Sequence, residues 1–213
     1  MDKSLTLLSG GWISEAESLL QFYKWLTVEL ASTVQGCKPS TVLSLVDTRG
    51  LALLTLWRQY GIDFLQQTRV RYLVLRKSVN RETVLFYRPE ALEACLKDKR
   101  HQYFFRSLGY PIEQGVEACL DLLRRRFQAA CPHEIGLILG IPLKDVLGFM
   151  GLSNLPLTCR KEWCIYGNPD ESIRTIERFA RNRSVVLEHL SGGMTCHEIL
   201  CGKLDFRQGS ASA

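Results

Sequence analysis

Two short apolar runs separated by a polar turn constrain the fold of this chain more than any other feature. Residues 70–75 and 83–87 are rich in valine, leucine and aromatic side chains, and residues 78–81 between them read Ser-Val-Asn-Arg. Strand-forming runs of this length, joined by a turn of this length, predict a β-hairpin. The chain therefore contains at least a small antiparallel sheet.

The segments around this hairpin repeat their apolar residues at the spacing of a helix. The predicted helices cover residues 14–30, 50–61, 89–98, 101–108, 112–127, 170–182 and 184–190. Gly61 is expected to end the second of them, because glycine is the usual residue just beyond a helix. Two more stretches, residues 40–46 and 161–167, are short and rich in strand-forming side chains, so each predicts a strand.

Together these elements predict a mixed α/β (α+β) fold, in which many helices surround a small sheet that includes the hairpin, and helix exceeds strand. Residues 1–193 are expected to form a single globular domain, with an N-terminal helix at 14–30 and a helical subregion at 90–152. Residues 194–213 are expected to form a C-terminal appendage and a loose tail, because they follow the pair Gly192-Gly193 and end in small polar residues.

Composition and charge exclude several classes of protein. With 213 residues, 46% of them hydrophobic and 23% charged, the chain has the make-up of an ordinary globular protein. The net charge of +5 is mild compared with that of a dedicated nucleic-acid binder. No apolar run is long enough for a membrane span or a secretory signal, so a cytoplasmic location is expected. The eight cysteines are then expected to be reduced thiols.

The common catalytic and nucleotide-binding motifs are missing. The sequence contains no G-x-x-x-x-G-K-[ST] loop and no G-x-G-x-x-G after a strand. It also lacks the G-x-S-x-G of serine hydrolases and the Cys-x-x-Cys of thioredoxins. Whether the chain is an enzyme stays open at this stage.

The stretch from Cys131 to Met150, "CPHEIGLILGIPLKDVLGFM", reads as two short helices separated by Gly-Ile-Pro. Residues 134–150 match the pattern of many bacterial helix-turn-helix units, and the arginines at 124–126 lie just upstream. A recognition helix must offer polar side chains to base edges, however, and residues 143–152 are mostly apolar. We therefore expect this second helix to be buried and treat a DNA-binding regulator as the alternative function.

Few residues of the sequence are candidates for a metal, haem or flavin site. His133 and Glu134 lack the second histidine of H-E-x-x-H, and neighbouring residues on a helix point about 100° apart. Cys196, His197 and Cys201 are the metal-ligand candidates, with Cys159 and Cys164 to complete the set. Cys131 before Pro132 is the candidate axial ligand for a haem. The aromatic side chains of residues 57–64 and 103–105 fit a core better than a surface that stacks a flavin.

The candidate ligand-binding residues are His133, Glu134, Arg71 and Arg88. The first two are polar residues in an otherwise apolar stretch, although His133 also suits a partly buried histidine that fixes the start of a helix. The two arginines belong to a basic cluster around the hairpin. Such a cluster would bind an acidic partner or a phosphate, or would protect a sheet edge from aggregation.

Five stretches of the sequence resemble, in order, a bacterial family with no assigned function, DUF3793. They read "GCKPSTVLSL", "YRPEALEACL", "LGYPIEQGVEACLDLL", "PHEIGLILGIPLKDVLGFM" and "EWCIYGNPDES". The resemblance runs from about Glu29 to about His189, and the stretch 132–149 is its most specific part. Where the family often has a "CAPT"-like string, this chain has Leu-Ala-Ser-Thr at residues 30–33.

The resemblance implies an order of elements and an association with flavodoxin-type redox proteins, but no activity. With the residues above, it leads us to expect an accessory or ligand-binding protein without classical catalytic machinery. Its partner would be a small anionic molecule or a redox protein, which would meet the surface around His133, Glu134 and the basic hairpin.

Overall fold

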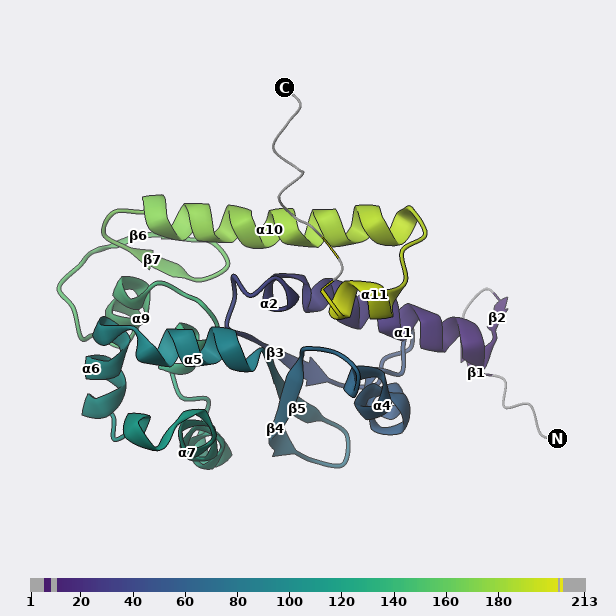
Figure 1. Cartoon of the computed structure of the whole chain (residues 1–213), viewed down its shortest axis with the longest axis horizontal. Coiled ribbons are helices and arrows are strands. Elements are labelled where there is room, and N and C mark those ends of the chain that lie inside the picture. The colour runs from purple at the N-terminus through teal and green to yellow at the C-terminus, as the bar shows by residue number, and fades with distance from the viewer. Residues whose placement is uncertain (1–5, 9–10, 203, 205–213) are drawn as a thin grey trace, which may run out of the picture.

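The computed structural model describes residues 6–8, 11–202 and 204 of the chain. It confirms a mixed α+β fold in which helix clearly exceeds strand (Figure 1). The strands are β1 (Thr6–Leu8), β2 (Gly11–Ile13), β3 (Ser40–Leu45), β4 (Arg71–Lys77), β5 (Glu82–Tyr87), β6 (Leu157–Arg160) and β7 (Cys164–Tyr166). The longer helices are α1 (Glu15–Glu29), α5 (Pro89–Lys97), α6 (Lys99–Ser107), α7 (Val116–Ala129) and α10 (Asp170–Ser191).

Short helical segments complete the described chain. They are α2 (Ala31–Val34), α3 (Leu53–Leu56), the π-helical turn η1 (Trp57–Gly61), α4 (Ile62–Leu65), the 3₁₀ turn η2 (Ile112–Gln114), α8 (Ile135–Ile138), α9 (Leu143–Phe149) and α11 (Cys196–Leu200). None of the described helices is both long enough and apolar enough to cross a membrane.

The predicted hairpin is present, and it forms most of the central sheet. Strands β4 and β5 pair antiparallel, β3 pairs with the other edge of β5, and the order is therefore β3-β5-β4. Along β5, Val84 and Phe86 belong to one buried cluster, while Leu85 and Tyr87 belong to another. Both faces of the sheet are thus covered, which explains why its strands read as almost continuous apolar runs.

The two buried clusters have different helices. The cluster on the Leu85 face includes residues of α5, α6, α7 and α8, with Val146 of α9. The cluster on the Val84 face includes residues of α1, α3 and η1, with Leu200 of α11. Figure 1 shows α5, α6 and α7 on one side of the sheet and α4 on the other. The sheet is therefore the middle layer of the molecule.

The prediction that a helix ends at Gly61 is wrong. The helix continues from η1 into α4, and Gly61 has an ordinary right-handed backbone. A Cβ atom at Gly61 would lie only 2.1 Å from Cε3 of the Trp57 indole, which is almost fully buried. Gly61 is therefore a residue within the helix that leaves space for the Trp57 ring, and it does not cap the helix.

Helix α10 is one continuous helix where the sequence suggested two stretches, 170–182 and 184–190. It contacts α1 and α2, and in Figure 1 it runs across the top of the molecule. Arg183, which lies between the two stretches, forms two hydrogen bonds with the carboxylate of Glu29 at 2.8 and 2.9 Å. The neighbouring Asn182 donates to Ser32 Oγ at 3.2 Å. These tertiary contacts hold the helix through its most polar turn.

Several elements lie where the sequence analysis had no regular structure, and β6 and α11 are two of them. Strand β6 precedes the expected strand at 161–167 and pairs with it to form a small hairpin, β6–β7. Helix α11 lies in the segment assigned to a C-terminal appendage, and its Ile199 and Leu200 are fully buried. Of the loose tail expected there, residues 205–213 lie outside the described residues.

Candidate ligand-binding cavity

The structure separates His133 from Glu134. Glu134 is about 1% exposed, and its Oε1 lies 2.7 Å from Nε of Arg126 and accepts a hydrogen bond from Tyr110 Oη at 3.0 Å. His133 is exposed, contrary to the expectation of a partly buried ring, and lies edge-on to Phe149 at 5.0 Å between centroids. Both residues precede helix α8, which begins at Ile135. Glu134 is therefore committed to an internal ion pair, while His133 faces outward.

The two predicted arginines do not join these residues. Arg71 is exposed at the start of β4, opposite Tyr87 in the sheet. Arg88 lies just before α5, donates from Nη1 to the carbonyl oxygen of Val34 at 2.8 Å, and has Nε 3.7 Å from Glu90. Arg88 thus connects the sheet to the end of α2. The four residues do not form one site.

The candidate metal ligands are also divided. Cys196 is buried in the core, and burial raises the pKa of its thiol. His197 is exposed, and both of its ring nitrogens lie 3.7 Å from Sγ of Cys201. In the described part of the chain, no group of three or more histidine, cysteine or acidic residues is placed to hold a metal ion.

The helix-turn-helix-like unit has its polar side chains turned inward. Helices α8 and α9 span only four and seven residues. Asp145 is about 1% exposed, and the side chain of Lys144 is 21% exposed. Helix α9 packs against β7, and Lys144 reaches α10 through Ser172. The face that would read bases is therefore covered by the protein itself.

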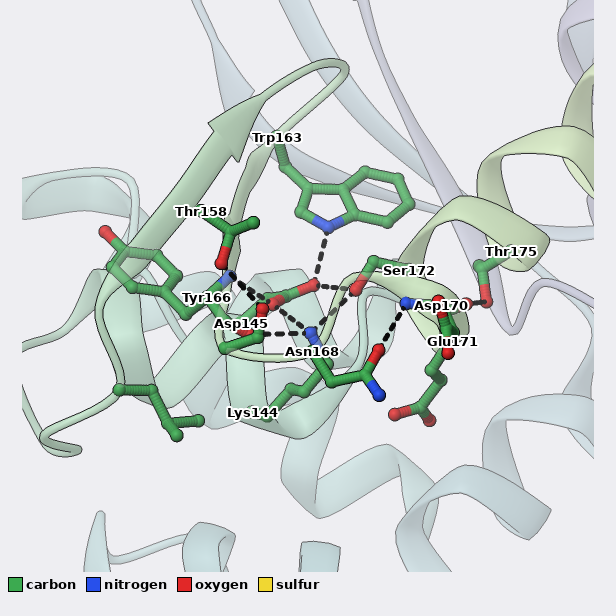
Figure 2. Close-up of polar contacts among 12 residues, drawn as sticks. Lys144, Asp145, Thr158, Trp163, Tyr166, Asn168, Asp170, Glu171, Ser172 and Thr175 are labelled. Atoms are coloured by element: carbon green, nitrogen blue, oxygen red, sulfur yellow. Dashed lines mark hydrogen bonds and ion pairs between the residues drawn. The ribbon is translucent and has the colours of Figure 1, made fainter.

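A closed polar network lies where α9, β7 and α10 meet (Figure 2). The carboxylate of Asp145 accepts hydrogen bonds from Lys144 Nζ at 2.7 Å, Trp163 Nε1 at 2.9 Å, the Tyr166 amide at 2.9 Å and Ser172 Oγ. Lys144 also donates to the Tyr166 carbonyl and to Ser172 Oγ, each at 2.9 Å. All three donors of the ammonium group are thus in use.

This network stabilises the fold and offers no nucleophile. Burial would raise the pKa of Asp145, but the hydrogen bonds from Lys144, Ser172, Tyr166 and Trp163 outweigh it and hold the pKa below its usual range. Ser172 is fully buried and donates its proton to Asp145. A serine that is activated for attack needs access to substrate and a free base, and Ser172 has neither.

A cavity opens on the Lys144 side of this network, and we call it the basic cavity. Its volume is about 480 Å³, within the range of small-molecule sites. It lies between the loop before β3, helices α5 and α6, the α8–α9 pair and α10. Its lining residues are Gly36, Cys37, Pro39, Ala91, Cys95, Arg100, His101, Leu137, Gly140, Ile141, Pro142, Leu143, Lys144, Leu147, Glu171, Thr175 and Arg178.

Local sequence signals position the walls of the basic cavity. Asp98 caps helix α6 by accepting hydrogen bonds from the amides of Arg100 at 2.9 Å and His101 at 3.3 Å, which places both residues on the first turn. Gly140, with φ of 80°, turns the chain between α8 and α9. A Cβ atom there would lie 3.2 Å from Cδ of Pro39, across the cavity wall.

Most charged side chains of the basic cavity that are not already bound within the protein are positive. Arg178 of α10 forms no ion pair with any residue that the structure describes and lies 5.8 Å from the centroid of the Phe179 ring. Arg100 is 75% exposed, and its nearest carboxylate, that of Asp98, is 3.5 Å away. Glu171 is the one acidic residue among the lining residues. The cavity therefore favours a negatively charged group.

His101 lines the basic cavity and has one ring nitrogen bound to the backbone. Its Nδ1 lies 2.8 Å from the carbonyl oxygen of Cys95. Because a carbonyl oxygen only accepts, the ring donates through Nδ1–H. In the neutral ring Nε2 then carries the lone pair, so it can accept a proton or a hydrogen bond from a ligand.

Two thiols border the same cavity, and both are protonated groups at neutral pH. Burial raises the pKa of Cys95 to about 12. Burial also raises the pKa of Cys37, although the hydrogen bond from Asn182 Nδ2 at 2.9 Å and the charges of Arg178 and Lys38 oppose the change. The arrangement can therefore bind an anion beside polarisable thiols, while neither thiol is an activated nucleophile.

The structure is that of a mixed α+β protein with a cavity of about 480 Å³ between its helical subregion and α10. The family resemblance is confirmed: the model of the family described as "Protein of unknown function (DUF3793)" matches residues 26–200, and the chain belongs to this family. No curated protein and no solved structure matches the chain.

Proposed function

We propose that this protein binds a small anionic molecule in the basic cavity. The observation that carries the proposal is a cavity of about 480 Å³ with Arg100, His101 and Arg178 on its lining. Sites for small molecules combine apolar walls with a few polar groups that fix orientation. Here Leu137, Ile141, Pro142, Leu143 and Leu147 supply the apolar wall.

The three polar groups have different tasks in this proposal. Arg178 supplies the main charge because it has no internal ion pair to break, and guanidinium groups bind carboxylates and phosphates in a two-pronged geometry. His101 accepts or donates one hydrogen bond through Nε2. Arg100, whose side chain is 75% exposed, steers the anion, and salt screens its charge.

The proposal is tested by calorimetric titration with inorganic phosphate, succinate and citrate at constant ionic strength. We expect at least one of these anions to bind saturably, and Arg178→Ala to weaken that binding at least fivefold. Arg174→Ala is the matched control, since Arg174 lies one turn earlier on α10 and does not line the cavity. Absence of saturable binding, or equal losses in the two variants, would overturn the proposal.

The alternative, a DNA-binding regulator built on residues 134–150, has less support. Lys144 and Asp145 are held by the network of Figure 2, and Arg126 by Glu134. Retention on a DNA resin that falls steeply with salt, and that Arg125→Ala reduces, would favour this alternative over the anion site.

A further inference from the structure

A second cavity lies on the opposite side of the helix pair α8–α9, and its chemistry is different. Its volume is about 290 Å³, and we call it the apolar cavity. Ile141 lines both cavities, and Asp145 of the polar network borders this one as Lys144 borders the other. The lining residues are Cys131, Pro132, His133, Ile135, Gly136, Leu139, Ile141, Asp145, Val146, Phe149, Trp163 and Cys164.

Three rings border the apolar cavity, and each of them has a contact with another residue. The indole of Trp163 is held by its hydrogen bond to Asp145 Oδ2 at 2.9 Å. His133 and Phe149 pack edge-to-face with their ring planes at 85°. Phe149 is 54% exposed, so part of its ring is free to contact a bound molecule. Flat rings interact favourably with such edges and faces.

The polar side chains that line the apolar cavity are poorly suited to bind a charged ligand. Both oxygens of Asp145 already accept two hydrogen bonds each. Burial and the charge of Glu134 raise the pKa of Cys131, so its thiol is neutral. Cys131, His133 and Cys164 do not form a metal-binding group in the part of the chain that the structure describes. A charge placed here would lose its hydration without gaining a partner.

We propose that the apolar cavity binds a neutral aromatic compound of one or two rings, with His133 as its single hydrogen-bonding partner. Size supports this ligand class, because a dry cavity of about 150 Å³ is enough to bind benzene. The aromatic walls and the neutral thiol of Cys131 favour a ring over a sugar or a peptide. This second site does not depend on the anion site.

The test uses 5-fluoroindole as the probe and fluorine NMR of the probe as the readout. We expect saturable binding at one site. Leu139→Trp fills the cavity, and Phe149→Ala removes one ring wall, so each should weaken binding at least fivefold. Because Phe149 is 54% exposed, its variant should fold even if Leu139→Trp does not. In the Arg178→Ala variant, whose anion site is weakened, 5-fluoroindole-2-carboxylate should bind at least fivefold more weakly than 5-fluoroindole.

Two controls separate the sites. Leu152→Ala removes an apolar side chain that is 57% exposed but does not line the cavity, and should change binding less than twofold. Arg178→Ala should weaken anion binding and leave 5-fluoroindole binding unchanged. The proposal is overturned if the probe does not saturate, if Phe149→Ala binds it as the wild type does, or if the carboxylate binds to Arg178→Ala as well as the probe does.

Discussion

Glu134 and Asp145 are both about 1% exposed, and their carboxylates have different sets of partners. Glu134 has one charged partner, Arg126, and one hydroxyl partner, Tyr110. Asp145 has one charged partner and three neutral donors. A buried charge persists only when it is paired and hydrogen-bonded, so both residues are structural.

Replacing Glu134 should therefore affect stability. Glu134→Gln keeps the shape but leaves Arg126 without its counter-charge, and we expect a loss of about 2 kcal/mol in the free energy of unfolding. Urea denaturation measures it. Glu113→Gln is the control, since Glu113 also pairs with an arginine but is exposed, and its effect on the free energy of unfolding should be clearly smaller. Unchanged stability with lost ligand binding would return Glu134 to the list of binding residues.

Asp145 predicts a dependence of stability on pH. Because its folded-state pKa lies below the usual value, the ionised form stabilises the fold above the unfolded-state pKa of about 4. That contribution is lost as the pH falls through the folded-state pKa. Asp145→Asn should reduce the free energy of unfolding by about 3 kcal/mol at pH 7. Below about pH 4, the difference in this free energy between wild type and variant should become smaller.

Denaturation at a series of pH values from 7 to 3 tests this expectation. The comparison must be made as a difference between wild type and variant, because Asp47, Glu82 and Asp98 also have lowered pKa values and destabilise the wild type in acid. A difference that stays constant down to pH 3 would show that Asp145 is not the group responsible.

At the scale of elements, the sequence predicts what local periodicity determines. The hairpin, β3 and helices α1, α5, α6 and α7 follow from apolar spacing, and Pro89 marks the start of α5. Elements that depend on distant contacts were not predicted. The short strand β6 exists because it pairs with β7, and α10 is continuous through Asn182 because α1 and α2 supply partners for its polar side chains.

The π-helical turn gives a prediction at this scale. Gly61→Ala would improve helix propensity, yet the new Cβ atom would overlap the buried Trp57 ring. We expect a net loss of about 2 kcal/mol in the free energy of unfolding. Gly50→Ala is the control, because no atom lies within 4 Å of a Cβ atom there, and thermal unfolding should show little change. Equal melting temperatures for the two variants would contradict this account.

At the scale of the whole molecule, the candidate site could not be read from the sequence. Cys37, the adjacent pair Arg100 and His101, and Arg178 come from three separate segments, and only the packing of α10 over the helical subregion brings them to one cavity. No spacing motif relates them. The stretch that the sequence analysis did single out, residues 131–150, supplies walls to both cavities, because its two short helices lie between them. The sequence could single out this stretch, but its position between two cavities could not be predicted.

The same scale decides whether the C-terminal segment is an appendage. Ile199 and Leu200 of α11 are fully buried, and Leu200 belongs to the cluster on the Val84 face of the sheet. Leu200→Ala should therefore reduce the free energy of unfolding by about 3 kcal/mol, the usual cost of removing a buried leucine side chain. Leu187→Ala, at a site that is 51% exposed, should cost less than about 1 kcal/mol.

Cooperativity distinguishes an integral helix from a docked one. If α11 is part of the same folding unit as the sheet, Leu200→Ala shifts the whole unfolding transition and keeps the urea m-value, because tryptophan fluorescence and circular dichroism then report one event. If α11 is only docked, it detaches first. The two signals would then separate, and the main transition would keep its wild-type midpoint, which would restore a domain boundary near Gly193.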